Sequence, residues 1–269
     1  MLSSERKLYG VMSKINVLIV QISPKRGKKK RNLNKVKSLI EESNCHNPDL
    51  IILPEFFNTG IDNQSFIELA EEEKDSETLA FLSEIAIKYN TNIVGGTIIE
   101  KDCDKLYNTS YFLNREGNIL GKYRKIHLFN YFGGNEGECI TPGTDLVVLD
   151  TDIGKVGMSI CFDIRFPLMF NKLLKKGAEI IVCPAAWAND WIHTWEICNQ
   201  SLAMQNAAYF ISSTGCGEVG YTMAGNSMIV EPNGRIISRL GREESTLCKQ
   251  IDLNDVKVLR DAFPIMNLE

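Results

Sequence analysis

The chain has 269 residues, of which 44% are hydrophobic and 24% are charged, and its formal net charge is −4. This composition is typical of a soluble globular protein with one large or two small domains, and it lacks the basic excess that favours nucleic-acid binding. The apolar run at residues 15–22 is too short to span a bilayer and has no small-residue cleavage site. We therefore expect a core strand there and neither an export signal nor a membrane anchor.

Apolar runs rich in Ile and Val alternate with amphipathic stretches through the first half of the chain. The pattern predicts strands at residues 15–22, 49–55 and 91–100, with helices at 31–44 and 76–90 between them. Alternation of this kind indicates an α/β fold with largely buried sheets.

The second half repeats the pattern. A hairpin turning at 152–155 is followed by a predicted helix at 168–175, a strand at 178–186, a helix at 195–208 and a strand at 208–214. Asn233-Gly234 is a strong signal for a further hairpin turn. Because no Pro/Gly/Ser-rich linker divides these units, we predict one domain over residues 15–269, preceded by an N-terminal extension at 1–14.

Two compositional features concern the surroundings of the protein. The basic run 25–31, KRGKKKR, is compatible with a nucleic-acid or membrane patch, but we interpret it as a solvated loop that opens the first helix. The eight cysteines form no CxxC pair, which favours reduced thiols in the cytoplasm over a disulfide framework or a zinc site. They are Cys45, Cys103, Cys139, Cys161, Cys183, Cys198, Cys216 and Cys248.

Three reactive side chains follow predicted strands. Glu55 comes after DLIILP, Lys125 after ILGKYR and Cys161 after KVGMSI. In open α/β sheets, reactive groups gather beyond the carboxyl ends of the strands. A carboxylate, an amine and a thiol at such ends are the components of nucleophilic attack on a carbonyl. Each residue alone has an ordinary interpretation: a carboxylate beside a helix N-terminus, a solvated lysine, and a thiol buried as a small apolar side chain.

The local sequences around these three residues form an ordered set. LPEFFNTG, KYRKIHLF and GMSICFDIRFP resemble the three signature blocks of the nitrilase superfamily, the carbon–nitrogen hydrolases, and the resemblance extends to the closing LRDAFPI. It implies a four-layer α-β-β-α sandwich and assembly as a homodimer or larger homo-oligomer. It also assigns the catalytic glutamate, lysine and cysteine to Glu55, Lys125 and Cys161. A second, supporting glutamate matches Glu136, with Glu138 as a rival at a less fitting distance from the Pro142-Gly143 pair.

The resemblance implies a thiol amidohydrolase mechanism that requires no metal and no organic cofactor. Glu55 takes the thiol proton while Cys161 attacks the substrate carbon, and a thioester forms and is hydrolysed. Lys125 and the backbone N–H of Phe162 stabilise the negative oxygen, in the manner of the nucleophile elbow of serine hydrolases. The alternative for a cysteine enzyme is a Cys161–His127 dyad.

The segment CFDIRFP looks most like the ω-amidase branch, which acts on dicarboxylate monoamides. There Arg165 would bind a carboxylate, although a structural salt bridge with Asp163 or another acid is an alternative. Trp187 is either an apolar wall of the pocket or a core residue. The run QSLAMQN at 200–206 departs from the RARAxEN that is usual in the family, and the basic run 25–31 is atypical. An N-carbamoyl-amide hydrolase, a nitrilase and a non-catalytic scaffold of the same fold remain alternatives.

Overall fold

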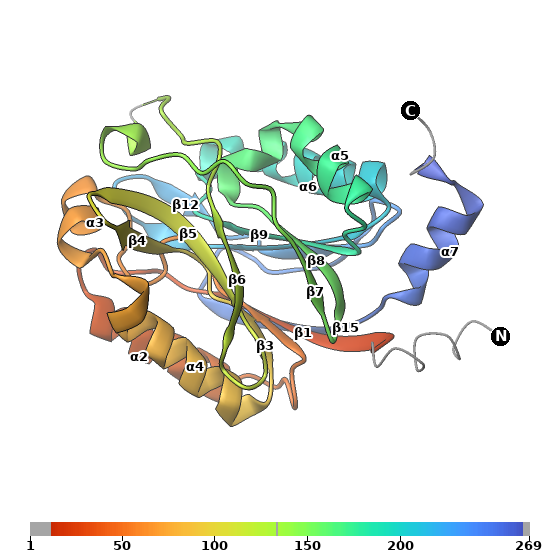
Figure 1. Ribbon diagram of the computed structural model, residues 1–269, viewed down its shortest axis with the longest axis horizontal. Helices are drawn as coiled ribbons and strands as arrows, with labels where there is room; N and C mark the ends of the chain where they lie inside the picture. The colour runs from red at the N-terminus through yellow and green to blue at the C-terminus, as the bar shows by residue number, and fades with distance from the viewer. Residues whose placement is uncertain (1–11, 133, 266–269) are drawn as a thin grey trace.

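The structure, a computed structural model, describes residues 12–132 and 134–265. Two β-sheets pack face to face, and helices cover the outer face of each sheet (Figure 1). The predicted four-layer α-β-β-α sandwich is confirmed. Of the predicted N-terminal extension, residues 1–11 lie outside the described residues, and the first strand begins at Lys14.

The first sheet has the order β15-β1-β2-β3-β5-β4, with β6 on the other edge of β5. Strands β1, β2 and β3 run parallel, and the remaining pairs are antiparallel. The bounds are β1 Lys14–Gln21, β2 Leu50–Ile52, β3 Asn92–Val94, β4 Ile98–Asp102, β5 Lys105–Leu113, β6 Ile119–Arg124 and β15 Ser245–Asp252.

The second sheet has the order β14-β13-β10-β9-β8-β7, and its central strands β8, β9 and β10 are parallel. A separate two-stranded ribbon, β11 with β12, follows β10. The bounds are β7 Val148–Thr151, β8 Gly154–Met158, β9 Ile180–Ala185, β10 Tyr209–Thr214, β11 Cys216–Glu218, β12 Thr222–Ala224, β13 Met228–Val230 and β14 Ile236–Arg239.

The helices form the two outer layers. Figure 1 shows α2 and α4 on the first sheet, α5 and α6 on the second, and α7 beyond one end of the sandwich. The bounds are α2 Lys29–Glu41, α3 Asn63–Leu69, α4 Glu77–Tyr89, α5 Pro167–Lys175, α6 Ile192–Asn206 and α7 Asn254–Ala262. Short 3-10 helices lie at η1 Glu73–Asp75, η2 Glu136–Glu138, η3 Cys161–Arg165 and η4 Asn189–Trp191.

Strand β1 illustrates why both faces of the sheets are apolar. Successive side chains of a strand point to opposite faces. Val17 and Ile19 enter the core between the two sheets, while Leu18 and Val20 enter the core under α2 and α4. A continuous apolar run is therefore the expected sequence of this strand, because neither face meets water.

The segment 91–100, predicted as one strand, forms two strands because Gly95 and Gly96 break it. Gly96 has a positive φ of 55°, and a Cβ there would lie 2.2 Å from the carbonyl oxygen of Pro54. The glycine thus lets the backbone next to Glu55 approach closely. The phenylalanine after Glu55 is fixed as well, because the N–H of Phe56 donates to Thr97 Oγ1 at 3.0 Å.

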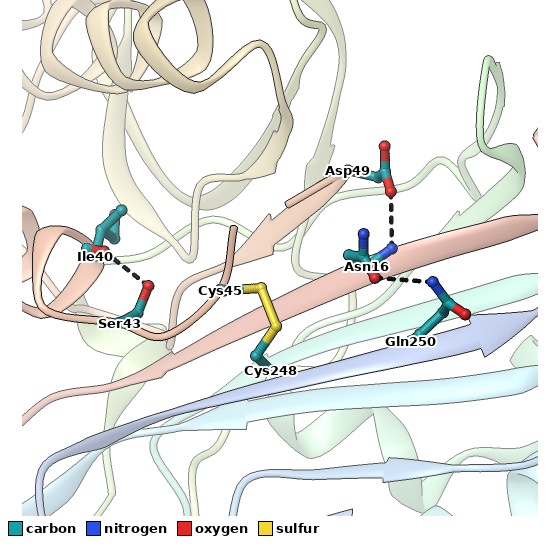
Figure 2. Close-up of a disulfide and its surroundings, with 7 residues drawn as sticks. All are labelled: Asn16, Ile40, Ser43, Cys45, Asp49, Cys248 and Gln250. Atoms are coloured by element: carbon teal, nitrogen blue, oxygen red, sulfur yellow. Dashed lines mark hydrogen bonds between the residues drawn. A yellow bond between two sulfur atoms is a disulfide. The ribbon is translucent and has the colours of Figure 1, made fainter. Parts of the chain in front are cut away.

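The prediction that all cysteines are reduced thiols is wrong for one pair. Cys45 and Cys248 form a disulfide, which Figure 2 shows beside Asn16 and Gln250. The two residues are separated by 203 positions, so the spacing of cysteines along the chain gives no sign of the pair. Pairing of β1 with both β2 and β15 brings them together, since the loop before β2 and strand β15 flank the same strand. The other six cysteines are free.

The basic run begins as an exposed turn at residues 25–28 and continues into α2, which starts at Lys29, as expected for a solvated loop that opens the first helix. Lys29 forms an ion pair with the buried Glu71 at 2.8 Å, whereas Lys28 and Lys30 are exposed. Within residues 12–132 and 134–265, no helix has the length and apolar character needed to cross a membrane.

Candidate active site

Cys161 is the first residue of the short helix η3, at the sharp turn that follows β8. Its φ is +46°, a conformation that residues other than glycine rarely adopt. Its side chain is packed into the inter-sheet core, and the residue is 8% exposed. Backbone strain of this kind persists only where surrounding contacts enforce it, and it occurs preferentially at functional sites.

Glu55, Lys125 and Glu136 form a buried charge cluster beside this turn. Lys125 Nζ lies 2.8 Å from Glu55 Oε1 and 2.8 Å from Glu136 Oε2. Glu55 and Lys125 are each 2% exposed, and Glu136 is 7% exposed. Glu138, the rival of Glu136, is exposed and accepts a hydrogen bond from Asn135. Of the two candidates, Glu136 is therefore the one that contacts the lysine.

Asn108, in the interior of β5, also belongs to this cluster and was not predicted. Its Nδ2 donates to Glu55 Oε1 at 2.8 Å and to Glu136 Oε1 at 2.7 Å. The available signal was the polar run Asn108-Thr109-Ser110 inside an otherwise apolar strand. Asn is disfavoured in strands, so a fully buried one suggests a specific hydrogen-bonding role.

Backbone N–H groups complete the hydrogen bonding of the two carboxylates. Ala186 N–H donates to Glu55 Oε2 at 2.9 Å, and Phe129 N–H donates to Glu136 Oε2 at 2.9 Å. Ala186 follows β9 directly, so Glu55 connects the two sheets across the sandwich.

Burial controls the protonation of the thiol and of its neighbour. Burial and the nearby Glu55 raise the pKa of Cys161 well above its usual range, and Lys125 opposes them without prevailing. Burial also raises the pKa of Glu55, against the opposing effects of Lys125 and Cys161. Cys161 therefore rests as a thiol next to a carboxylate of increased basicity, rather than as a preformed thiolate.

Lys125 stays charged in spite of its burial. Burial acts to lower the pKa of Lys125, but Glu136, Glu55 and Cys161 outweigh it and raise that pKa well above its ordinary value. A buried ammonium is tolerated only with such partners. The cluster thus presents a fixed positive charge next to the sulfur.

The contacts of Asp163 match neither the Asp163–Arg165 salt bridge nor the Cys161–His127 dyad that the sequence left open. It is fully buried and bonds to Tyr123 Oη at 2.7 Å and to the ring Nδ1 of His127 at 2.7 Å. The proposed salt bridge to Arg165 is not formed, and His127 stacks on Phe166 at a centroid distance of 3.6 Å. The His127 ring is held by Asp163 at Nδ1 and by the stacked Phe166 ring, so the geometry does not support the Cys161–His127 dyad.

The predicted substrate-binding residues lie on and next to η3. Phe162 is the second residue of this helix, where a backbone N–H has no acceptor within the helix, and its ring packs against Phe129 at 5.2 Å. Arg165 is exposed and lies over the rings of Trp187 and Trp191, at 5.7 and 5.5 Å from the ring centroids. Trp187 is 4% exposed and belongs to the inter-sheet core, so it serves as the floor under the guanidinium.

Within the described part of the chain, no group of three or more His, Cys, Asp or Glu residues has the arrangement needed to hold a metal ion. The side chains that meet at the site supply a thiol, two carboxylates, an ammonium and the asparagine amide. Together they match nucleophilic attack on a carbonyl or nitrile carbon with general acid–base assistance.

Comparison with known proteins agrees with this geometry. The family model of the carbon–nitrogen hydrolases matches residues 16–261. The ω-amidase NIT3 of Saccharomyces cerevisiae is 33% identical over 268 residues, which cover 94% of this chain and 92% of the relative. The ω-amidase NIT2-A of Xenopus laevis is 34% identical over 265 residues, which cover 94% of each chain.

A solved structure gives the same result for the fold. The crystal structure of Saccharomyces cerevisiae Nit3, a member of branch 10 of the nitrilase superfamily, superposes with a TM-score of 0.89 at 31% identity. The match covers 96% of this chain and 97% of that one. Sequence, fold and site geometry lead to one conclusion: the chain belongs to the carbon–nitrogen hydrolase family.

Proposed function

We propose that the protein hydrolyses the terminal amide of a small dicarboxylate monoamide, releasing ammonia and a carboxylic acid, with Cys161 as the nucleophile. One observation carries the proposal. At the strained turn, the charge of Glu55 acts on the Cys161 thiol, and the same carboxylate lies 2.8 Å from the Lys125 ammonium. The ω-amidase names of the relatives support the choice of substrate class.

The first half-reaction forms a thioester. Glu55 accepts the proton of the Cys161 thiol as the sulfur attacks the amide carbon, and the carbonyl oxygen becomes negative. Lys125 and the N–H of Phe162 stabilise this oxygen, and each such donor contributes about 3 kcal/mol in hydrolases that use one. Glu55 then returns the proton to the nitrogen, ammonia leaves, and the acyl group remains on the sulfur.

The second half-reaction releases the acid. Glu55 takes a proton from water, and the resulting hydroxide attacks the thioester carbon while the same two donors stabilise the oxygen. The tetrahedral intermediate collapses and expels the sulfur, which regains its proton from Glu55. Glu136 and Asn108 hold Lys125 and Glu55 in place throughout, through the bonds of 2.8 and 2.8 Å described above.

Arg165 supports the choice of a substrate with a second carboxylate. Its guanidinium is exposed and rests on two indole rings, so its N–H donors remain available to an anionic group. Arg165→Gln should raise KM at least about 10-fold for succinamate and leave KM for the neutral butyramide unchanged. Arg235→Gln, an exposed arginine paired with Glu231, is the matched control. Equal effects on both amides would exclude Arg165 as the carboxylate-binding residue.

A substrate panel tests the reaction itself. Ammonia release is measured with α-ketoglutaramate, succinamate, glutamine, N-carbamoyl compounds and simple nitriles, for the wild type, Cys161→Ala and the exposed-thiol control Cys103→Ala. Preference for the first two substrates and loss of turnover only in Cys161→Ala are expected. Preference for carbamoyl compounds or nitriles would reassign the substrate class, and no turnover with any class would favour a non-catalytic scaffold. Mass spectrometry of the trapped acyl-enzyme must locate the adduct on Cys161 rather than on Cys183 or Cys198.

We also propose that the chain assembles as a homodimer or larger homo-oligomer. The outer helices support this, because Leu168 on α5 and Ile197 and Met204 on α6 are 79%, 64% and 55% exposed. Exposed apolar side chains gathered on one layer favour burial in an interface. Sedimentation velocity of the wild type and of Ile197→Asp tests the proposal, with a monomeric wild type as the contradicting result.

A further inference from the structure

We propose that Asp163 is a positioning residue whose buried carboxylate sets the location of Cys161 relative to Lys125. The inference rests on the proposed function, because it explains how the attacking sulfur and the stabilising ammonium keep a productive separation. It concerns a residue that touches neither the substrate carbon nor the leaving group.

The hydrogen bonds of Asp163 join the two segments that carry these side chains. Oδ2 accepts from the backbone N–H of Ile160 at 2.9 Å and from Tyr123 Oη at 2.7 Å. Oδ1 accepts from the backbone N–H of His127 at 3.1 Å and lies 2.7 Å from the His127 ring Nδ1. Ile160 immediately precedes Cys161, while Tyr123 and His127 lie two residues before and two residues after Lys125.

Burial makes this arrangement rigid. Asp163, Tyr123 and Ile160 are all 0% exposed, so no water competes for these bonds. Burial and the neighbouring Asp163 raise the pKa of Tyr123 well above its usual range, so its hydroxyl remains a donor at all physiological pH values. Ile160, whose N–H donates to Asp163, directly precedes Cys161. Its hydrogen bond therefore helps to hold the strained backbone conformation of Cys161.

Two further contacts join the same two segments. The backbone N–H of Phe166 donates to the carbonyl of Asp163 at 2.9 Å, and the Phe166 ring stacks on His127 with an interplanar angle of 7°. The segment after Lys125 and the helix after Cys161 are therefore joined at both the carboxylate and the ring. Any movement of one segment relative to the other therefore breaks hydrogen bonds to the same buried side chain, that of Asp163.

The substitution Asp163→Asn tests the inference with a minimal change of shape. One carboxylate oxygen becomes an NH2 group, which cannot accept a hydrogen bond. The backbone N–H of either Ile160 or His127 then faces another donor and loses its acceptor. We expect kcat to fall about 100-fold with KM changed less than about 3-fold, since misplacement of a reacting group by about 1 Å has an effect of this size. Asp150→Asn, an exposed aspartate paired with Lys155, is the control and should retain the wild-type kcat.

A substrate-independent measurement separates positioning from general stability. In Asp163→Asn the loosened turn should increase the rate of iodoacetamide alkylation at Cys161 about 10-fold, while the fully buried Cys183 stays unmodified. Alkylation of Cys183 together with Cys161 would indicate global loosening and overturn the inference. So would a folded variant with the wild-type kcat.

Tyr123→Phe provides a second variant in case Asp163→Asn does not fold. It removes one donor but leaves a backbone N–H on each carboxylate oxygen, and we expect kcat to fall about 10-fold. Tyr209→Phe is the matched control, because Tyr209 also donates to an aspartate, Asp255, at a distance from the site. An equal loss of activity in both phenylalanine variants, or in neither, would overturn the inference.

The two proposals fail in distinguishable ways. If Cys161→Ala retains amide hydrolysis, the proposed function is wrong. If Cys161→Ala is inactive while folded Asp163→Asn keeps both the wild-type kcat and the wild-type alkylation rate, only the positioning role is wrong.

Discussion

Glu55 and Lys125 come from different strand ends, 70 residues apart in the sequence, and meet as a buried ion pair of 2.8 Å. Their charges act on the neighbouring thiol in opposite directions. Glu55 raises the pKa of Cys161, and Lys125 lowers it. Burial contributes most to the raised pKa of Cys161, and the two charges shift that pKa further in opposite directions.

Glu55→Gln should separate thiol reactivity from catalysis. Removal of the negative charge eliminates one of the causes that raise the pKa of Cys161, while burial and Lys125 remain. The pKa therefore falls, and iodoacetamide alkylation begins at a lower pH than in the wild type. Amide hydrolysis should nevertheless fall about 1,000-fold, because the general base is lost. Alkylation rates between pH 6 and 10 and kcat are the measurements, with Glu138→Gln as the exposed control. An alkylation profile displaced to higher pH would contradict the assigned balance of charges.

Asn108→Ala should weaken both stability and activity. The substitution removes the donor that bridges Glu55 and Glu136 and leaves two buried carboxylates with one hydrogen bond fewer each. We expect the free energy of unfolding to drop by about 3 kcal/mol and kcat to fall about 10-fold. Urea denaturation and steady-state kinetics measure the two effects. The exposed Asn118→Ala serves as the control, and an unchanged urea midpoint for Asn108→Ala would refute the bridging role.

Reduction of the Cys45–Cys248 disulfide should destabilise the fold without affecting the chemistry. A cross-link between residues 203 positions apart removes a large part of the entropy of the unfolded chain, about 5 kcal/mol in the loop-entropy model. A dithiol reductant should thus lower Tm of the wild type, and Cys248→Ser should abolish the dependence on reductant. Cys103→Ser, which changes an exposed free thiol, should behave as the wild type. A reductant-sensitive Tm in Cys248→Ser would assign the effect to another site.

Glu100 should make stability sensitive to acid. Burial acts to raise the pKa of Glu100, but Arg124, Lys122 and Thr109 outweigh it and lower that pKa from 4.5 to about 2. Because the folded-state pKa lies below the ordinary one, the stabilisation is complete above pH 4.5 and is lost as the pH falls to about 2. The decrease of Tm over this interval should be smaller in Glu100→Gln than in the wild type or the exposed control Glu84→Gln. Parallel Tm curves for all three proteins would argue against the assigned pKa.

Local patterns in the sequence predicted most of the elements and the positions of the reactive residues. Runs such as 15–22 are apolar on both faces, which predicts buried strands wherever they pair, and Glu55, Lys125 and Cys161 each follow such a strand. The predicted strand at 91–100 shows the limit of this reasoning. Its break at Gly95 and Gly96 is required by the close approach of Pro54, which no pattern within the segment reveals.

Contacts between distant segments depended on the tertiary structure. Asn108 and Asp163 are ordinary polar residues in the sequence, and only the packing of the two sheets places each between charged or strained neighbours. The Cys45–Cys248 pair likewise arises from the pairing of β1 with strands from both ends of the chain.

The sequence by itself determined an α/β chain with a carboxylate, an amine and a thiol at strand ends, because alternation and apolar runs are properties of neighbouring residues. The tertiary structure alone decided that Glu136 rather than Glu138 contacts Lys125 and that Glu55 pairs with the same lysine. It also decided that Asp163 bonds to the segments around Lys125 and Cys161. The physical reason is that burial removes water as a competing partner. The hydrogen bonds and ion pairs that form in the core then depend on which side chains the two sheets bring together. The separation of two residues along the chain does not predict this.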